Sequence, residues 1–202
     1  MNYLHCIIVR NLWPVIFVLF FAITENTYGA KMNPTKAELR MVNLETTVVI
    51  HSIKHLTWKE SQLPPVQEGV KILVVGHDHC LLKERLQYLI AESNSKISER
   101  KIEVVTCSNI DEANHHTLDK QVVFVIFLRS VQEKWGEQEF IDRSGLVLYG
   151  QGKSFMRRGL NLCSRVDNNR LKISLNLKKM NSAEIEVDKK LLLSNRILSV
   201  HN

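Results

Sequence analysis

Apolar residues along the chain follow two spacings. Residues 70–75 and 121–128 are almost continuous apolar runs, typical of strands buried on both faces of a sheet. Residues 81–90 instead place their leucines on one side of a helix. A second strand is expected at 101–106, so that strand, helix and strand follow one another. This order predicts a parallel sheet with right-handed crossovers.

Helical spacing precedes these strands, and a hairpin pattern follows them. Residues 34–56 carry apolar positions at helical spacing, with Asn33 as the expected cap and Pro34 as a favourable first residue. Residues 160–166 and 171–177 alternate apolar and polar positions around an Asp-Asn-Asn turn, which indicates an antiparallel hairpin. The remaining expectations are a helical or irregular connection at 110–118, a helix at 131–141, a strand at 145–149, a helical turn at 177–182 and a last amphipathic helix at 187–200.

Together these elements predict an α/β fold: layered, with a mostly parallel sheet extended by an antiparallel C-terminal hairpin and helices on its faces. The chain has 202 residues, of which 45% are hydrophobic. That length and composition suit one domain with a substantial core and exclude wholesale disorder. We therefore expect a single α/β domain over residues 31–202.

The first thirty residues differ from the rest of the chain. Arg10 is the only charged residue before Glu25, and residues 12–23 form an apolar run as long as a signal-peptide core. The run is shorter than the roughly 20 residues of a membrane-spanning helix. Counting apolar residues 4–9 with it leaves an uncleaved anchor as the alternative. We expect a signal peptide over residues 1–30, cleaved after Gly29 or Ala30, and export from the cytoplasm.

Basic residues are in excess, and one segment concentrates them. The formal net charge is +6, and residues 153–179 contain eight basic residues against one acidic residue. Such a segment suits an acidic partner or an anionic membrane surface, and a solvated basic face is the alternative. The candidate docking residues are Lys153, Phe155, Met156, Arg157 and Arg158, with the phenylalanine and the methionine as apolar anchors.

Two glycine-containing segments resemble nucleotide-binding loops without matching them. Gly152, Lys153 and Ser154 follow a strand, but Val147 stands where a phosphate-binding loop has its first glycine. Gly76 also follows a strand, but the later glycines of a dinucleotide-binding fingerprint are missing. We therefore expect no nucleotide cofactor and no catalytic residues.

Histidines follow the first of the sheet strands. His77, His79 and the pair at 115–116 have no established zinc spacing, so we expect no metal site. Strand ends in α/β folds nevertheless favour ligand pockets. A small-molecule site at residues 76–80 stays open as an alternative.

The cysteines suggest one disulfide. Cys80 lies just past one strand and Cys107 ends the next, so that both thiols reach the same sheet edge if these strands are parallel neighbours. In an oxidising compartment we expect them to pair, and closing a loop of about 28 residues would contribute about 3.5 kcal/mol. Two separate thiols are the alternative. Cys163 is expected to be a buried small hydrophobe, and Cys6 leaves with the signal peptide.

Several segments, in this order along the chain, share their residues with a known family: 54–58, 71–79, 101–107 with 110–113, 153–162, 170–177 and 187–198. They resemble the YfiR-like family of periplasmic regulators. The resemblance covers essentially residues 36–199, and the chain departs from the family pattern at Lys59, Arg158 and Cys163.

This resemblance implies a periplasmic, non-enzymatic binding protein. The best-known members bind the periplasmic part of an inner-membrane diguanylate cyclase and hold it inactive, which lowers cyclic-di-GMP and biofilm formation. They tend to form homodimers. We therefore expect such a regulator, with no cofactor and no nucleic-acid partner. An exported small-ligand receptor, or an accessory protein of a histidine kinase or an outer-membrane transporter, is the alternative.

Overall fold

The computed structural model describes residues 34–78, 80–132, 135, 140, 142–152, 155, 157–167, 170–193 and 197–201. The chain divides into two units, residues 1–33 and 34–202, and the fold is that of the second unit. The expected signal peptide lies outside the described residues and stays a prediction. Among the helices that the structure describes, none is long and apolar enough to cross a membrane.

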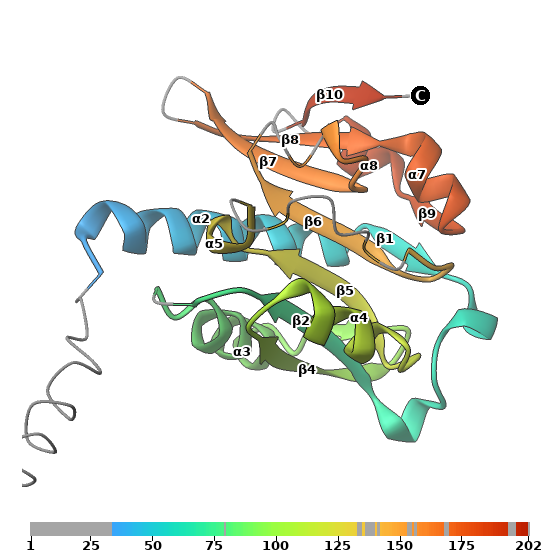
Figure 1. Ribbon diagram of the computed structural model, residues 1–202. Helices are drawn as coiled ribbons and strands as arrows, with labels where there is room; N and C mark the ends of the chain where they lie inside the picture. The colour runs from blue at the N-terminus through green and yellow to red at the C-terminus, as the bar shows by residue number, and fades with distance from the viewer. Residues whose placement is uncertain are drawn as a thin grey trace, which may run out of the picture. The chain divides into compact units, whose positions relative to one another are not determined.

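A mostly parallel sheet forms the centre of the fold (Figure 1). Its described strands are, in spatial order, β10 (Ile197–His201), β8 (Arg170–Asn176), β7 (Leu162–Asp167), β6 (Val147–Gln151), β5 (Val122–Phe127), β2 (Val70–Val75), β4 (Arg100–Cys107) and β3 (Lys96–Ile97). β2 pairs in parallel with β4 and β5, and β6 and β7 continue in that direction. β7 and β8 form the expected antiparallel hairpin. The predicted α/β fold class is confirmed.

Helices cover both faces of this sheet. Those described are α2 (Lys36–Ile53), α3 (Leu82–Glu92), α4 (Ile110–Thr117), α5 (Arg129–Gln132), α7 (Leu177–Ser182) and α8 (Lys189–Leu192), with short 3₁₀ turns at Glu60–Gln62 and Val66–Glu68. α2 and α3 share one core with Ile72 and Val74 of β2, whereas α4 shares another with Leu73 and Val75. Because successive strand residues point to opposite faces, one continuous apolar run supplies both cores.

The first helix begins later than the sequence pattern predicts. Thr35 caps α2, with its Oγ1 accepting from the Glu38 backbone N–H at 3.2 Å. The Glu38 carboxylate in turn accepts from the Thr35 backbone N–H at 2.7 Å. Pro34 therefore precedes the helix, and the expected cap Asn33 lies outside the described residues. The reciprocal capping box decides the start because it satisfies two backbone donors that a helix end otherwise leaves unpaired.

A second, two-stranded sheet ends α2 and was not expected from the sequence. β1 (Leu56–Trp58) pairs antiparallel with β9 (Ile185–Val187). The indole Nε1 of Trp58 donates to the Gly145 backbone oxygen at 3.0 Å. Leu56 and Trp58 are both buried in this arrangement. The chain thus leaves the helix after Ile53 and pairs with β9, where the two apolar side chains of β1 are buried.

The expected last helix is wrong. Residues 187–200 contain the end of β9, the short helix α8 and most of β10. Asp188 caps α8 by accepting from the Lys190 backbone N–H at 2.8 Å, and Leu193 just beyond it is 85% exposed. β10 then pairs in parallel with β8 at the sheet edge. Pairing with an available strand edge has outweighed the helical spacing of the leucines, because helical spacing is a weak local preference beside tertiary pairing.

The order of the strands creates one switch point. The chain leaves β2 through α3 to β4 on one side, then returns through α4 to β5 on the other side of β2. The carboxyl ends of β2 and β5 are therefore followed by segments that diverge. In open α/β sheets this divergence leaves a crevice beyond the strand ends, which is where such folds usually bind ligands.

Candidate functional site

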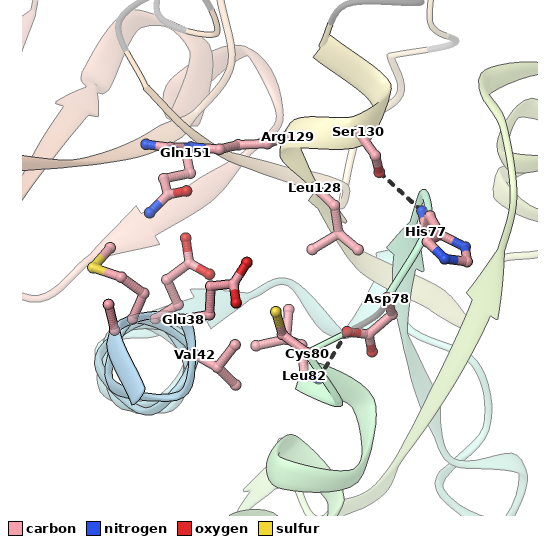
Figure 2. Close-up of a pocket in the computed structure, with 13 residues that line it drawn as sticks. Glu38, Val42, His77, Asp78, Cys80, Leu82, Leu128, Arg129, Ser130 and Gln151 are labelled. Atoms are coloured by element: carbon pink, nitrogen blue, oxygen red, sulfur yellow. Dashed lines mark hydrogen bonds between the residues drawn. The ribbon is translucent and has the colours of Figure 1, made fainter. Parts of the chain in front are cut away.

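A cavity of about 320 Å³ lies at this switch point. It is bounded by α2, by the segment from the end of β2 to the start of α3, and by α5 with the end of β6 (Figure 2). His77, Asp78 and Cys80 are among its lining residues. The structure therefore places a cavity at the strand edge where the sequence left a small-molecule site open.

One part of the cavity wall is apolar. Met41 and Val42 come from α2, Leu82 begins α3, and Leu128 follows β5. Val42 and Leu82 also belong to the main core and are almost fully buried. This wall is consequently held by the packing of the fold, and it suits the hydrocarbon part of a ligand.

The polar side chains after β2 are used to fix the backbone. The Asp78 carboxylate accepts from the backbone N–H groups of Leu82 and Lys83 at 2.9 and 2.8 Å, which caps the start of α3. The His77 backbone N–H donates to Ser130 Oγ at 2.9 Å and ties this segment to α5 (Figure 2). These bonds define the shape of the cavity rim.

Gly76 permits the close approach that this rim requires. Its φ is +118°, and a Cβ at this position would lie 2.6 Å from Cγ2 of Val131. A side chain would therefore be strained by the backbone and would collide with α5. The glycine that resembled the start of a nucleotide-binding loop instead allows the segment after β2 to pack against α5.

Glu45 is the unusual ionisable group of the cavity. It projects from the buried side of α2 and is only 9% exposed. Burial raises the pKa of its carboxyl group to about 7, although Arg129 opposes the rise and Asp78 adds to it. Among the described residues its carboxylate has no hydrogen-bond or ion-pair partner. The charged or titratable groups around it are Glu38, His77, Asp78, Cys80, Arg129 and Tyr149.

Sequence reasoning missed Glu45, although a signal was present. The residue stands between Val42 and Val49 on the face of α2 that packs into the core. A lone carboxylate at such a position is uncommon, because burying a charge without a partner is costly. A carboxylate on the helix face that carries the buried valines was the available clue.

Glu45 should make the stability of the protein depend on pH. In the unfolded chain it titrates near pH 4.5, and in the fold near pH 7. Between these values unfolding releases a proton, so the free energy of unfolding falls as pH rises and levels off above pH 7. We expect Glu45→Gln to raise the free energy of unfolding at pH 8 by up to about 3 kcal/mol and to lose this advantage at pH 4.5. Urea unfolding at both pH values checks this, and an equal gain at both would contradict it.

The three described cysteines are free thiols, so the expected Cys80–Cys107 disulfide is absent from the structure. β2 and β4 are parallel neighbours as predicted, with Val75 opposite Cys107. The Cys107 side chain, however, packs in the core beneath α4, whereas Cys80 packs against the core of α2 and α3. Strand adjacency brought both residues to one edge but put the sulfurs on opposite faces of the sheet. Cys163 is buried, as expected.

The thiols should differ in reactivity. Burial raises the pKa of Cys107 and of Cys163 to about 12, and both side chains are almost inaccessible. Burial and nearby carboxylates also raise the pKa of Cys80, but its sulfur points into the cavity (Figure 2). We expect iodoacetamide to modify Cys80 first in the native protein and all three equally in denaturant. A non-reducing peptide map containing a Cys80–Cys107 crosslink would contradict the structure.

The segment that the sequence marked for docking is divided by the structure. Arg157 and Arg158 are exposed, as expected, whereas Lys153 and Met156 lie outside the described residues. Phe155 is fully buried, so its assignment as a docking anchor is wrong. Its ring lies 6.2 Å from that of Phe127 and 5.6 Å from that of Trp135, centre to centre. Phe127, Trp135 and Phe155 thus form an aromatic cluster. Phe155 is stabilised there because burial removes its whole side chain from water.

Arg158 contacts the same aromatic cluster. Its guanidinium lies over the Trp135 ring, with its central carbon 5.2 Å from the ring centre. Further along the basic segment, the Lys179 ammonium lies 2.8 Å from the Asp142 carboxylate. Part of the segment's charge is therefore engaged within the fold, and Arg157 is the more available of the two arginines.

Phe155 and Arg157 should respond differently to truncation. Phe155→Ala removes a fully buried ring and should lower the free energy of unfolding by about 3–5 kcal/mol. Arg157→Ala changes an exposed side chain and should stay within about 0.5 kcal/mol of the parent. Urea unfolding of both variants measures the contrast. Equal stability of the two would place Phe155 outside the core.

The other residues considered for chemistry are not brought together. His115 and His116 end α4, far along the chain from His77, and His79 lies outside the described residues. Among the described histidines, cysteines and acidic residues, no three form a group that could hold a metal ion. Gly152 follows β6, but Lys153 and Ser154 of the loop-like motif lie outside the described residues. The described residues thus offer a cavity and an exposed basic loop.

Comparison with known families identifies this fold. The model of the YfiR/HmsC-like family matches residues 43–194. The chain belongs to this family, whose members are periplasmic regulatory proteins. The match includes the strands that build the switch point and the loop that carries Arg157 and Arg158.

Solved structures resemble the chain more distantly. A conserved domain protein of Vibrio cholerae O1 biovar El Tor has a TM-score of 0.47 and 11% identity, over 79% of this chain and 60% of that one. The ABC domain of Streptococcus pneumoniae in complex with L-Trp has a TM-score of 0.48 and 11% identity, over 75% and 58% respectively. The chain thus spans less than two thirds of either protein. None of the curated proteins matches it.

Proposed function

We propose that this protein restrains an inner-membrane diguanylate cyclase by binding its periplasmic region, and thereby lowers cyclic-di-GMP and biofilm formation. The observation that carries the proposal is membership of the YfiR/HmsC-like family over residues 43–194. The proposed place of action is the periplasm, reached through the signal peptide expected at residues 1–30. The homodimer that the resemblance implies is part of the same proposal.

The exposed loop after β6 is the proposed docking surface. Arg157 and Arg158 are exposed there, and Phe155 beneath them fixes the loop to the core. Gly150 allows this anchoring, because the Phe155 ring packs against its backbone. A Cβ added to Gly150 would lie 2.6 Å from Cγ of Phe155. Exposed guanidinium groups beside a buried anchor suit an acidic protein surface, since charge complementarity steers association and selects partners.

Deleting the gene tests the cyclase assignment. If the protein holds a cyclase inactive, deletion should raise cellular cyclic-di-GMP, and the exported form should restore the lower level. A copy without residues 1–30 should not restore it. Cyclic-di-GMP measured by mass spectrometry gives the result. An unchanged level after deletion would reject the cyclase and favour a histidine kinase or an outer-membrane transporter as the partner.

Reversing one charge tests the docking surface. We expect Arg157→Glu to weaken restraint of the cyclase, because repulsion replaces attraction, by about 1 kcal/mol at a solvated rim and by several at a buried contact. Lys120→Glu is the matched control, since Lys120 is exposed and precedes β5, whereas Arg157 follows the neighbouring parallel strand β6 at the opposite end of the strands. Co-purification with membranes measures docking, and circular dichroism confirms that both variants fold. If the two variants docked equally well, Arg157 would not belong to the interface.

A further inference from the structure

We propose that the cavity at the switch point binds a small organic amine, a compact apolar body with one protonated amino group that pairs with Glu45. The cavity lies among α2, the end of β2 and α5, and it encloses about 320 Å³. That is near the lower end of small-molecule sites, roughly 300 Å³, so it suits a single ring or a short chain.

The apolar wall defines the body of the ligand. Met41, Val42, Leu82 and Leu128 lie around the cavity, and two of them are part of the main core. A hydrocarbon group placed against them loses contact with water without requiring the fold to move. The wall is therefore a preformed surface for the less polar end of the ligand.

Glu45 defines the charge of the ligand. Glu38 is held by the capping box of α2, and both oxygens of Asp78 accept from backbone N–H groups of α3. Glu45 is the lining carboxylate that has no partner among the described residues, and it is nine-tenths buried. A buried carboxylate without a partner is costly, and an ammonium would supply the missing charge-assisted hydrogen bond.

The surrounding charges favour a cation over an anion. Glu38, Glu45 and Asp78 line the cavity, and Arg129 is the lining guanidinium. Figure 2 shows Arg129 with Gln151 on the side of the cavity away from α2. No ion pair joins Arg129 to Glu45 among the described residues. A monovalent ammonium fits this single open carboxylate better than a divalent metal, which needs several donors.

A matched series of probes tests the proposal on the full exported chain. The probes are 2-phenylethylamine, 2-phenylethanol and phenylacetate, which share an aromatic body and differ in charge. We expect calorimetry at pH 8 to show saturable binding of the amine, at least tenfold weaker binding of the alcohol and none of the acid. Binding of the alcohol as tightly as the amine, tighter binding of the acid, or no binding by any probe would overturn the proposal.

Two further measurements place the amine in the cavity. Glu45→Gln should weaken binding of 2-phenylethylamine at least tenfold, whereas the charge-matched control Glu92→Gln, at the exposed end of α3, should leave it unchanged. Bound amine should also slow alkylation of Cys80, which lines the cavity. Equal affinities for the two variants, or unchanged alkylation of Cys80 at saturation, would place the amine elsewhere and overturn the assignment. These results are independent of any cyclase, because they use the purified protein alone.

Discussion

The burial of β2 between β4 and β5 is the constraint on which the rest of the structure depends. Its backbone is paired on both edges, and its side chains enter both cores. A strand held in this way fixes the exit of the chain at Gly76, where close packing against α5 leaves no room for a side chain. The capped start of α3, the cavity beside it and the arrangement of polar groups at its rim all follow from that fixed exit.

The central sheet could be predicted from the sequence, and its edges could not. β2 and β5 are almost wholly apolar runs, and burial on both faces leaves few other structures for such residues. The C-terminal segment was misjudged because its leucines also fit a helix. Residues 197–201 form a strand there because they pair with the free edge of β8, which lies more than twenty residues earlier in the chain. Tertiary pairing of this kind leaves no local pattern to detect.

The candidate site residues, like the strands, could be predicted from the sequence only in part. Exposure of Arg157 and Arg158 could be expected from their charge, whereas Phe155 had no sequence feature to distinguish an exposed anchor from a core ring. Its partners Phe127 and Trp135 come from other segments, and only the fold assembles them. Likewise strand order put Cys80 and Cys107 at one edge, but which face each sulfur occupies depends on the turn after Gly76. Glu45 was detectable as a carboxylate on the helix face that carries the buried valines.

The free thiols have a consequence for where the protein can fold. None of the described cysteines contributes a covalent link, so the two cores and the sheet pairing hold this domain together. Folding then needs no oxidase and no disulfide isomerase, and the reducing cytoplasm offers the same thermodynamic target as the oxidising side of the membrane. The described domain can therefore reach its folded state with or without an oxidant, from the same non-covalent contacts.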